Sequence, residues 1–309
     1  MNCKQGLALL WAVTLTTALC ADEPAKVPAP EASTPIALNP QSTVLLEKGS
    51  GKLLLKTKVC LREGLLEMFL CPKMTKEHES ILNIDAKAQV VHAGLLALGA
   101  KAGQPARFTP EFQPPEGQRV EIYVSWEDAS HIPQRMRAQD WIRHSTYRYF
   151  EAPLTALPKG VKFKGGDGEL QYDDVKKLLL FFGTMTPEQK ARFLALSGDM
   201  PFQKAVESLF EQSQPRGLEA EFVFTGSGFS RQPNGEEVYQ AEGGSLICVA
   251  NFGDATLDIN MKSTASNDSG LLFEPWTERI PPLQTDVTVE LIPVMTKPAG
   301  GATSSGTMK

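Results

Sequence analysis

The stretch "LLEMFLCPKMTKEHESILNI", Leu65–Ile84, decides how the fold begins. Two apolar runs, 65–71 and 78–84, flank the polar connection "PKMTKE", which predicts two strands. A short connection is typical of an antiparallel pair, and opposite residues of such a pair share a face. Cys71 would then lie opposite His78, with Ser80 and Glu67 on the same face.

Further strand-like runs lie on both sides of this stretch. One precedes it, "KLLLKTKVCL" (52–61), and the others follow at 119–126, 218–229, 237–242, 245–252, 256–261 and 286–294. Between them, "AKAQVVHAGLLALG" has apolar residues at helical spacing, with Asp85 as its cap and Gly99 at its end. These patterns predict an α+β fold with a mostly antiparallel β core and one main packed helix.

The pattern changes between residues 165 and 214. The segments "YDDVKKLLLFFG" (172–183), "TPEQKARFLALSG" (186–198) and "PFQKAVESLFEQ" (201–212) each predict an amphipathic helix. Thr186 and Gln189 have the spacing of a capping box, and Pro187 suits the first helical position. We therefore expect an inserted helical segment at 165–214.

The two ends of the chain differ in composition from the body. Residues 1–20 combine an early lysine with a short apolar stretch, which predicts a cleaved signal peptide and export to the periplasm or cell envelope. Residues 21–41 are rich in Pro and Ala and predict a flexible tether, and residues 296–309 predict a disordered tail. The body divides into 42–164, the insert, and 215–295.

Cysteine content and charge limit the classes of protein. After cleavage behind Cys20, the thiols that remain in an oxidising compartment are Cys60, Cys71 and Cys248, an odd number whose disulfide state the sequence leaves open. Lipidation at Cys20 is the alternative, and it is the one route by which we expect membrane attachment. The net charge of -5 argues against a nucleic-acid partner.

Several motifs resemble a known family. "KEHES" (76–80), "HAGLLALGAKAG" (92–103) and "EIYVSWED" (121–128) look like the YdjY-like domain of exported bacterial proteins. The segments at 138–143, 222–229 and 278–294 also resemble it, whereas the insert does not. The family has no established activity, so the resemblance implies a fold and an exported location but no chemistry.

The face that Cys71 and His78 would share is the candidate site. A thiolate and an imidazole are suitable ligands for zinc or copper, with His92 on the neighbouring helix or Glu67 as a third ligand. The same pair has the groups of a Cys-His nucleophile. The alternative is structural: a half-buried thiol, a histidine bonded to backbone, and His92 packed against the core.

A second candidate site lies in "GGDGELQYDD" (165–174), which resembles the later half of a helix-loop-helix calcium loop, with Asp167 and Asp174 at ligand positions. Phe163 and Gly165 occupy two other ligand positions and contribute no carboxylate, which weakens calcium binding. The alternative is a solvated turn.

Two functional hypotheses remain. The first is an exported, non-enzymatic module that binds an envelope protein or a small ligand, because no complete catalytic motif is present. The second is a metal- or thiol-dependent envelope enzyme that uses Cys71 and His78.

Overall fold

The computed structural model describes residues 34–263 and 273–295. The expected signal peptide, most of the expected tether and the expected tail lie outside these ranges. Within the expected tether, Ile36 and Ala37 form strand β1 (Ile36–Ala37), which pairs with β2 (Val44–Glu47).

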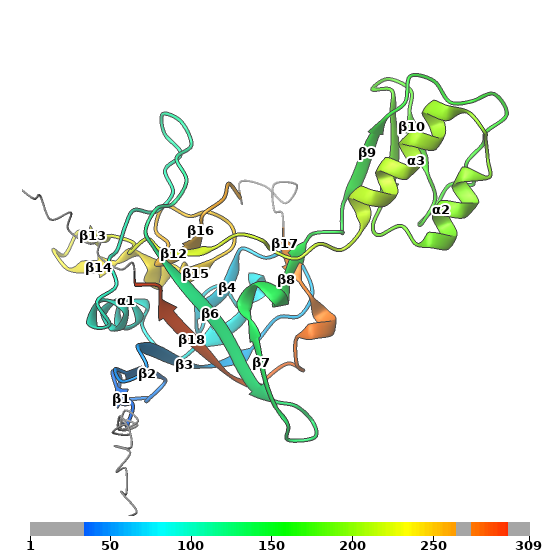
Figure 1. Cartoon of the computed structure of the whole chain (residues 1–309). Coiled ribbons are helices and arrows are strands. Elements are labelled where there is room, and N and C mark those ends of the chain that lie inside the picture. Colours follow the sequence, from blue (N-terminus) through cyan, green and yellow to red (C-terminus); the bar gives the residue numbers. More distant parts are fainter. Residues whose placement is uncertain (1–33, 264–272, 296–309) are drawn as a thin grey trace, which may run out of the picture. The chain divides into compact units, whose positions relative to one another are not determined.

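The central feature is a closed barrel of 8 strands (Figure 1). In order around the barrel they are β3 (Lys52–Val59), β18 (Asp286–Pro293), β6 (Gln118–Glu127), β12 (Phe222–Phe224), β16 (Leu257–Ile259), β15 (Ile247–Cys248), β4 (Met68–Pro72) and β5 (Ser80–Ile84). The barrel closes because β5 pairs with β4 on one side and with β3 on the other. Closure removes the exposed edges of the sheet.

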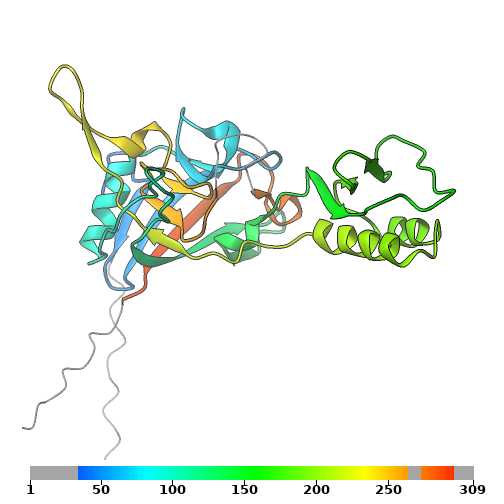
Figure 2. The ribbon, with the colours of Figure 1, turned by 90° about the horizontal axis from the view of Figure 1, so that it is seen from above.

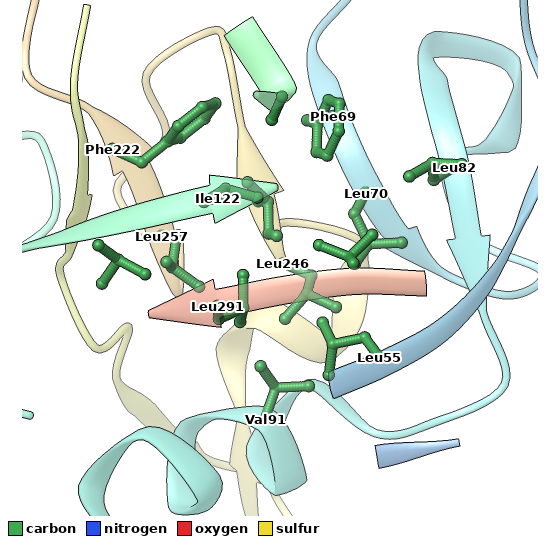
Figure 3. Close-up of a cluster of buried hydrophobic side chains, with 14 of the residues drawn as sticks. Leu55, Phe69, Leu70, Leu82, Val91, Ile122, Phe222, Leu246, Leu257 and Leu291 are labelled. Carbon is green, nitrogen blue, oxygen red and sulfur yellow. The ribbon is translucent and has the colours of Figure 1, made fainter. Parts of the chain in front are cut away.

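Alternating apolar residues fill the barrel. In β3, Leu53, Leu55 and Val59 are fully buried, while Lys56 and Lys58 on the opposite face are exposed. Leucine, isoleucine and phenylalanine side chains from every side of the barrel meet in its interior (Figure 3). The interior of an eight-stranded barrel is just wide enough for packed side chains or one small ligand, and here buried side chains occupy it.

A helix, short strands and 3₁₀ turns surround the barrel. Helix α1 (Ala88–Ala97) packs on it through Val91 and Leu95. Strand β7 (Pro133–Arg137) extends β6 as a hairpin, while β8 (Ile142–His144) pairs with β17 (Phe273–Pro275), and β13 (Phe229–Arg231) with β14 (Glu237–Tyr239). Single 3₁₀ turns lie at η1 (Glu77–Glu79), η2 (Ala138–Trp141), η3 (Gln240–Gly243) and η5 (Thr277–Arg279).

The insert has its own fold, which differs from the expected helical segment at 165–214 because it begins earlier, with β9 (Tyr149–Pro153), and contains a sheet as well as helices. Strands β9, β11 (Leu178–Phe182) and β10 (Gln171–Asp173) form a sheet in the order β10-β11-β9. Helices α2 (Pro187–Leu194) and α3 (Met200–Ser213) lie along one side of it (Figure 2). Buried side chains of the sheet and of the two helices, such as Phe181, Phe193 and Phe202, form a core separate from that of the barrel.

The predicted α+β class is wrong. The protein is mostly β, with 34% strand against 18% helix, and its core is a closed barrel. Part of the error is the segment 172–183, predicted as a helix, which forms the β10–β11 hairpin. An unbroken apolar run fits the period of a helix and that of a strand equally well. Here Leu179 and Phe181 point alternately into the insert core, and a turn at Lys177, with φ of 57°, reverses the chain.

Candidate functional site

The segment from Cys71 to Ser80 is a crossover and not a hairpin. Strands β4 and β5 are parallel, with Met68 paired to Ser80, Leu70 to Leu82 and Cys71 to Asn83. The antiparallel geometry that would place Cys71 opposite His78 is therefore wrong. The chain makes its return through Met74, at a φ of 64°, and the 3₁₀ turn η1.

Cys71 and His78 consequently have opposite environments. Cys71 is completely buried in a small cluster with Met68, Cys248 and Ala255, and burial raises the pKa of its thiol. The His78 side chain is 76% exposed, and its Nε2 is 3.9 Å from Glu79 Oε2. A buried thiol with a raised pKa is a poor nucleophile and a poor metal ligand. Cys71 and His78 therefore do not form a joint catalytic or metal site in this structure.

The other two residues of that expected face stabilise the crossover. Ser80 is fully buried and its hydroxyl donates to the carbonyl of Leu82 at 2.7 Å. Glu67 Oε2 lies 2.8 Å from Nζ of Lys76, which also lies 3.2 Å from Glu79 Oε1. Burial and the neighbouring Glu79 raise the pKa of Glu67 in spite of Lys76.

Lys76 thus links Glu67, just before β4, to Glu79 in the connection, and we call this pair of ionic contacts the staple. The ammonium of Lys76 lies 4.2 Å from the ring centre of Phe252. Its aliphatic stem passes so close to Gly244, at φ 131°, that a Cβ there would lie 2.6 Å from Lys76 Cγ. A side chain at position 244 would displace the staple, so both the backbone angle and the contact require glycine.

His92 belongs to a different network. Its Nδ1 lies 2.9 Å from the hydroxyl of Tyr239, which donates to the Gly226 carbonyl at 3.1 Å and lies 3.0 Å from the Thr256 hydroxyl. Burial lowers the pKa of His92 and raises that of Tyr239 to about 12. The network ties α1 to the strands beside it.

Neither predicted metal site gathers a ligand set. Among residues 34–263 and 273–295, no group of three or more His, Cys, Asp or Glu side chains is placed to hold a metal. In the expected calcium loop, Asp167 is exposed, and Asp174 pairs with Lys177 at 2.8 Å in the β10–β11 turn. Cys60, Cys71 and Cys248 are free thiols, and burial raises the pKa of Cys60 to about 12.

A groove of about 610 Å³ lies on the outer face of the barrel, and no sequence pattern predicted it. Its floor is a row of outward-facing residues on three paired strands, because Thr288 of β18 pairs with both Lys56 of β3 and Ser125 of β6. The next row contains Lys58, paired with Asn83 of β5 and with Asp286 of β18. Alternating lysine and threonine is ordinary for a solvent-facing strand, so the pattern carried no signal of a groove.

The lysines of this groove differ in whether they form ion pairs. Lys58 forms an ion pair with Asp286 at 2.6 Å. Lys56 and Lys73 also line the groove and are exposed, and neither forms an ion pair within the described part of the chain. Asp85, Glu127 and Gln134 complete a wall of hydrogen-bonding groups, with Trp126 beside them. A volume of this size is typical of sites for small ligands.

The fold and groove define a class: a closed β-barrel domain with an inserted subdomain and an external polar groove. Residues 44–164 match the YdjY domain, which confirms over this part of the chain the resemblance seen in the sequence. The match contains four of the barrel strands, β3 to β6, and the first strand of the insert. No curated protein and no solved structure matches the chain.

No helix within residues 34–263 and 273–295 is both long enough and apolar enough to cross a bilayer.

Proposed function

We propose that the protein is an exported, non-enzymatic binding module that holds an anionic group of a polar ligand in the groove of the barrel. The observation that carries the proposal is the pair Lys56 and Lys73, two exposed ammonium groups that line a cavity of about 610 Å³ without a carboxylate partner among the described residues. Hydroxyl and amide groups around them supply directional hydrogen bonds.

Two observations support binding over catalysis. The thiol that a Cys-His enzyme would need is completely buried and its pKa is raised. The groove itself contains lysine, hydroxyl, amide and carboxylate side chains, and neither histidine nor cysteine is among the described residues that line it. Such a lining suits recognition of a charged, hydrogen-bonding ligand.

The binding proposal is tested with a dye-labelled tetra-aspartate peptide in fluorescence polarisation at low ionic strength. The wild-type mature protein should bind it, and the double variant Lys56→Glu with Lys73→Glu should weaken binding by about tenfold or more, since two attractions become repulsions. A matched control is Lys48→Glu with Lys159→Glu, two exposed lysines outside the groove. Equal loss in both double variants would contradict a specific groove.

Export is part of the same proposal and rests on residues 1–20. Expression of the full chain in a bacterium, followed by fractionation and mass spectrometry of the N-terminus, should give a periplasmic product that begins at Ala21. A full-length product in the cytosol would contradict export. A product modified with lipid at Cys20 would replace the cleaved signal by the lipoprotein alternative.

A further inference from the structure

The groove continues beyond its lysine end. A second cavity of about 440 Å³ shares Trp126, Glu127 and Gln134 with the first and runs on to Glu278, Arg279 and Pro281. The shared residues lie where the β6–β7 hairpin leaves the barrel, with Trp126 paired to Gln134 and Glu127 to Pro133. The two cavities therefore adjoin at the root of this hairpin, and we refer to them together as the elongated groove.

The two halves of this groove differ in the cations that they offer. The first half contains Lys56, Lys58 and Lys73 together with Asp85, Asp286 and the shared Glu127, and Asp286 pairs with Lys58, which leaves Lys56 and Lys73 without an ion pair among the described residues. The second half contains Glu278, Asp128 and the shared Glu127. Among the described residues, Arg279 is the one cation that lines the second cavity. It is already engaged, since its guanidinium lies 3.4 Å from the ring centre of Trp276 and donates to the Asp140 carbonyl at 3.1 Å.

The carboxylates of the second half are held in place. Asp128 accepts from the backbone N–H groups of Ser130 and Ile132, at 2.9 and 3.0 Å, and from Gln134 Nε2 at 2.8 Å. The N–H groups of Ile132 and Ser130 lower the pKa of Asp128, so it is ionised at neutral pH. Glu278 is largely exposed, with one contact to Arg143 at 3.4 Å, and keeps capacity for a ligand.

We infer that the elongated groove binds an extended peptide segment whose acidic end lies against Lys56 and Lys73 and whose basic end lies against Glu127 and Glu278. The inference rests on the proposed function and adds the partner class. Charge complementarity favours a peptide, because a chain with both signs at separate ends is ordinary for peptides, while acidic saccharides and phosphates carry one sign. Trp126, between the two ends, offers an apolar contact, and the side chains of Ser125, Thr288 and Gln134 suit peptide amide groups.

The test compares two dye-labelled peptides of identical composition. One has a run of aspartates, a Gly/Ser spacer and a run of lysines; the other has the aspartates and lysines in alternation. The wild-type mature protein should bind the segregated peptide about tenfold more tightly than the alternating one. Equal affinities would overturn the inference, and so would tighter binding of an oligogalacturonate than of the segregated peptide.

Charge-swap variants then test both ends. The lysine-end variant (Lys56→Glu, Lys73→Glu) and the acid-end variant (Glu127→Lys, Glu278→Lys) should each weaken the segregated peptide by about tenfold. The variant with all four changes should recover binding to within about threefold of wild type, since the peptide can lie in the opposite direction. These side chains are exposed, and circular dichroism checks that each variant is folded.

Failure of this inference is distinguishable from failure of the proposed function. If the acid-end variant binds the segregated peptide as wild type does, while the lysine-end variant loses tetra-aspartate, the partner class is wrong and the anion-binding groove stands. If the lysine-end variant also binds tetra-aspartate as wild type does, both proposals are overturned.

Discussion

The barrel and the insert bury their apolar residues in different ways. The barrel brings together strands far apart in the chain, such as β3 with β18 and β4 with β15. The insert encloses its own core within one continuous segment, from Phe150 to Leu209. In both regions local sequence signals predicted single elements, such as β3 in the barrel and α2 in the insert, whereas the pairing of distant strands that closes the barrel has no local signal.

The largest expected effect tests whether the two cores are independent. Phe69 in the barrel and Phe202 in the insert are both fully buried, which makes Phe69→Ala and Phe202→Ala a matched pair. Each should cost about 3–5 kcal/mol in its own core. Hydrogen exchange read by mass spectrometry should show Phe202→Ala losing protection in β9, β11, α2 and α3 alone, and Phe69→Ala losing it in the barrel strands.

Loss of protection in both regions with either variant would contradict the independence of the cores. The barrel and the insert would then unfold as one cooperative unit with two hydrophobic clusters.

The next effect tests the staple that holds the parallel crossover. Lys76→Ala leaves the partly buried carboxylates of Glu67 and Glu79 without their cation, and should lower the free energy of unfolding by about 1–3 kcal/mol. Chemical denaturation measures it. The control is Lys73→Ala, an exposed lysine of the same connection without an ion pair among the described residues, which should change stability by less than about 0.5 kcal/mol. Equal effects of the two variants would contradict a stabilising role for Lys76.

A smaller effect compares helix caps in the two regions. In the insert, Thr186 accepts from Gln189 N at the start of α2, and Gln189 completes the predicted capping box, which is confirmed. In the barrel, α1 has no side-chain cap of its own, and Glu242 accepts from the N–H groups of Ala88 and Gln89 at 3.0 Å. Thr186→Ala and Glu242→Ala should each cost about 1 kcal/mol.

The two cap variants should differ in where they act. Hydrogen exchange should quicken in α2 for Thr186→Ala and in α1 for Glu242→Ala. An unchanged α1 in the Glu242 variant would show that this distant cap contributes nothing.

The smallest effect concerns pH. Burial lowers the pKa of His92 below its usual 6.5, so near that value the unfolded chain binds more protons than the folded protein. Stability of the barrel should therefore fall as the pH drops from about 7.5 to about 5.5. His92→Phe, which keeps a ring between Phe224 and Tyr239, should reduce this slope. His144, whose pKa burial also lowers, accounts for a remainder, and an unchanged slope in the His92 variant would contradict its burial as a neutral ring.

Part of this structure could be predicted from the sequence. The alternation in 52–61 and 286–294 gave strands β3 and β18, and the capping box gave the start of α2. The closed barrel could not be foreseen, because it depends on β5 pairing in parallel with β4 across a short connection, where short connections usually join antiparallel strands. The assumption of an antiparallel pair also led to the wrong prediction that Cys71 and His78 face each other. The groove was missed because its residues lie on separate strands whose register the sequence does not state.

The central claim is that the polar groove of the barrel, and not the insert, receives the ligand. The most direct measurement is an amide chemical-shift titration of the ¹⁵N-labelled mature protein with the charge-segregated peptide. If the groove binds the peptide, the shifts should concentrate at Lys56, Lys73, Ser125, Trp126 and Thr288. Shifts concentrated at the exposed aromatic residues of the insert region, Tyr147 and Tyr149, would contradict it.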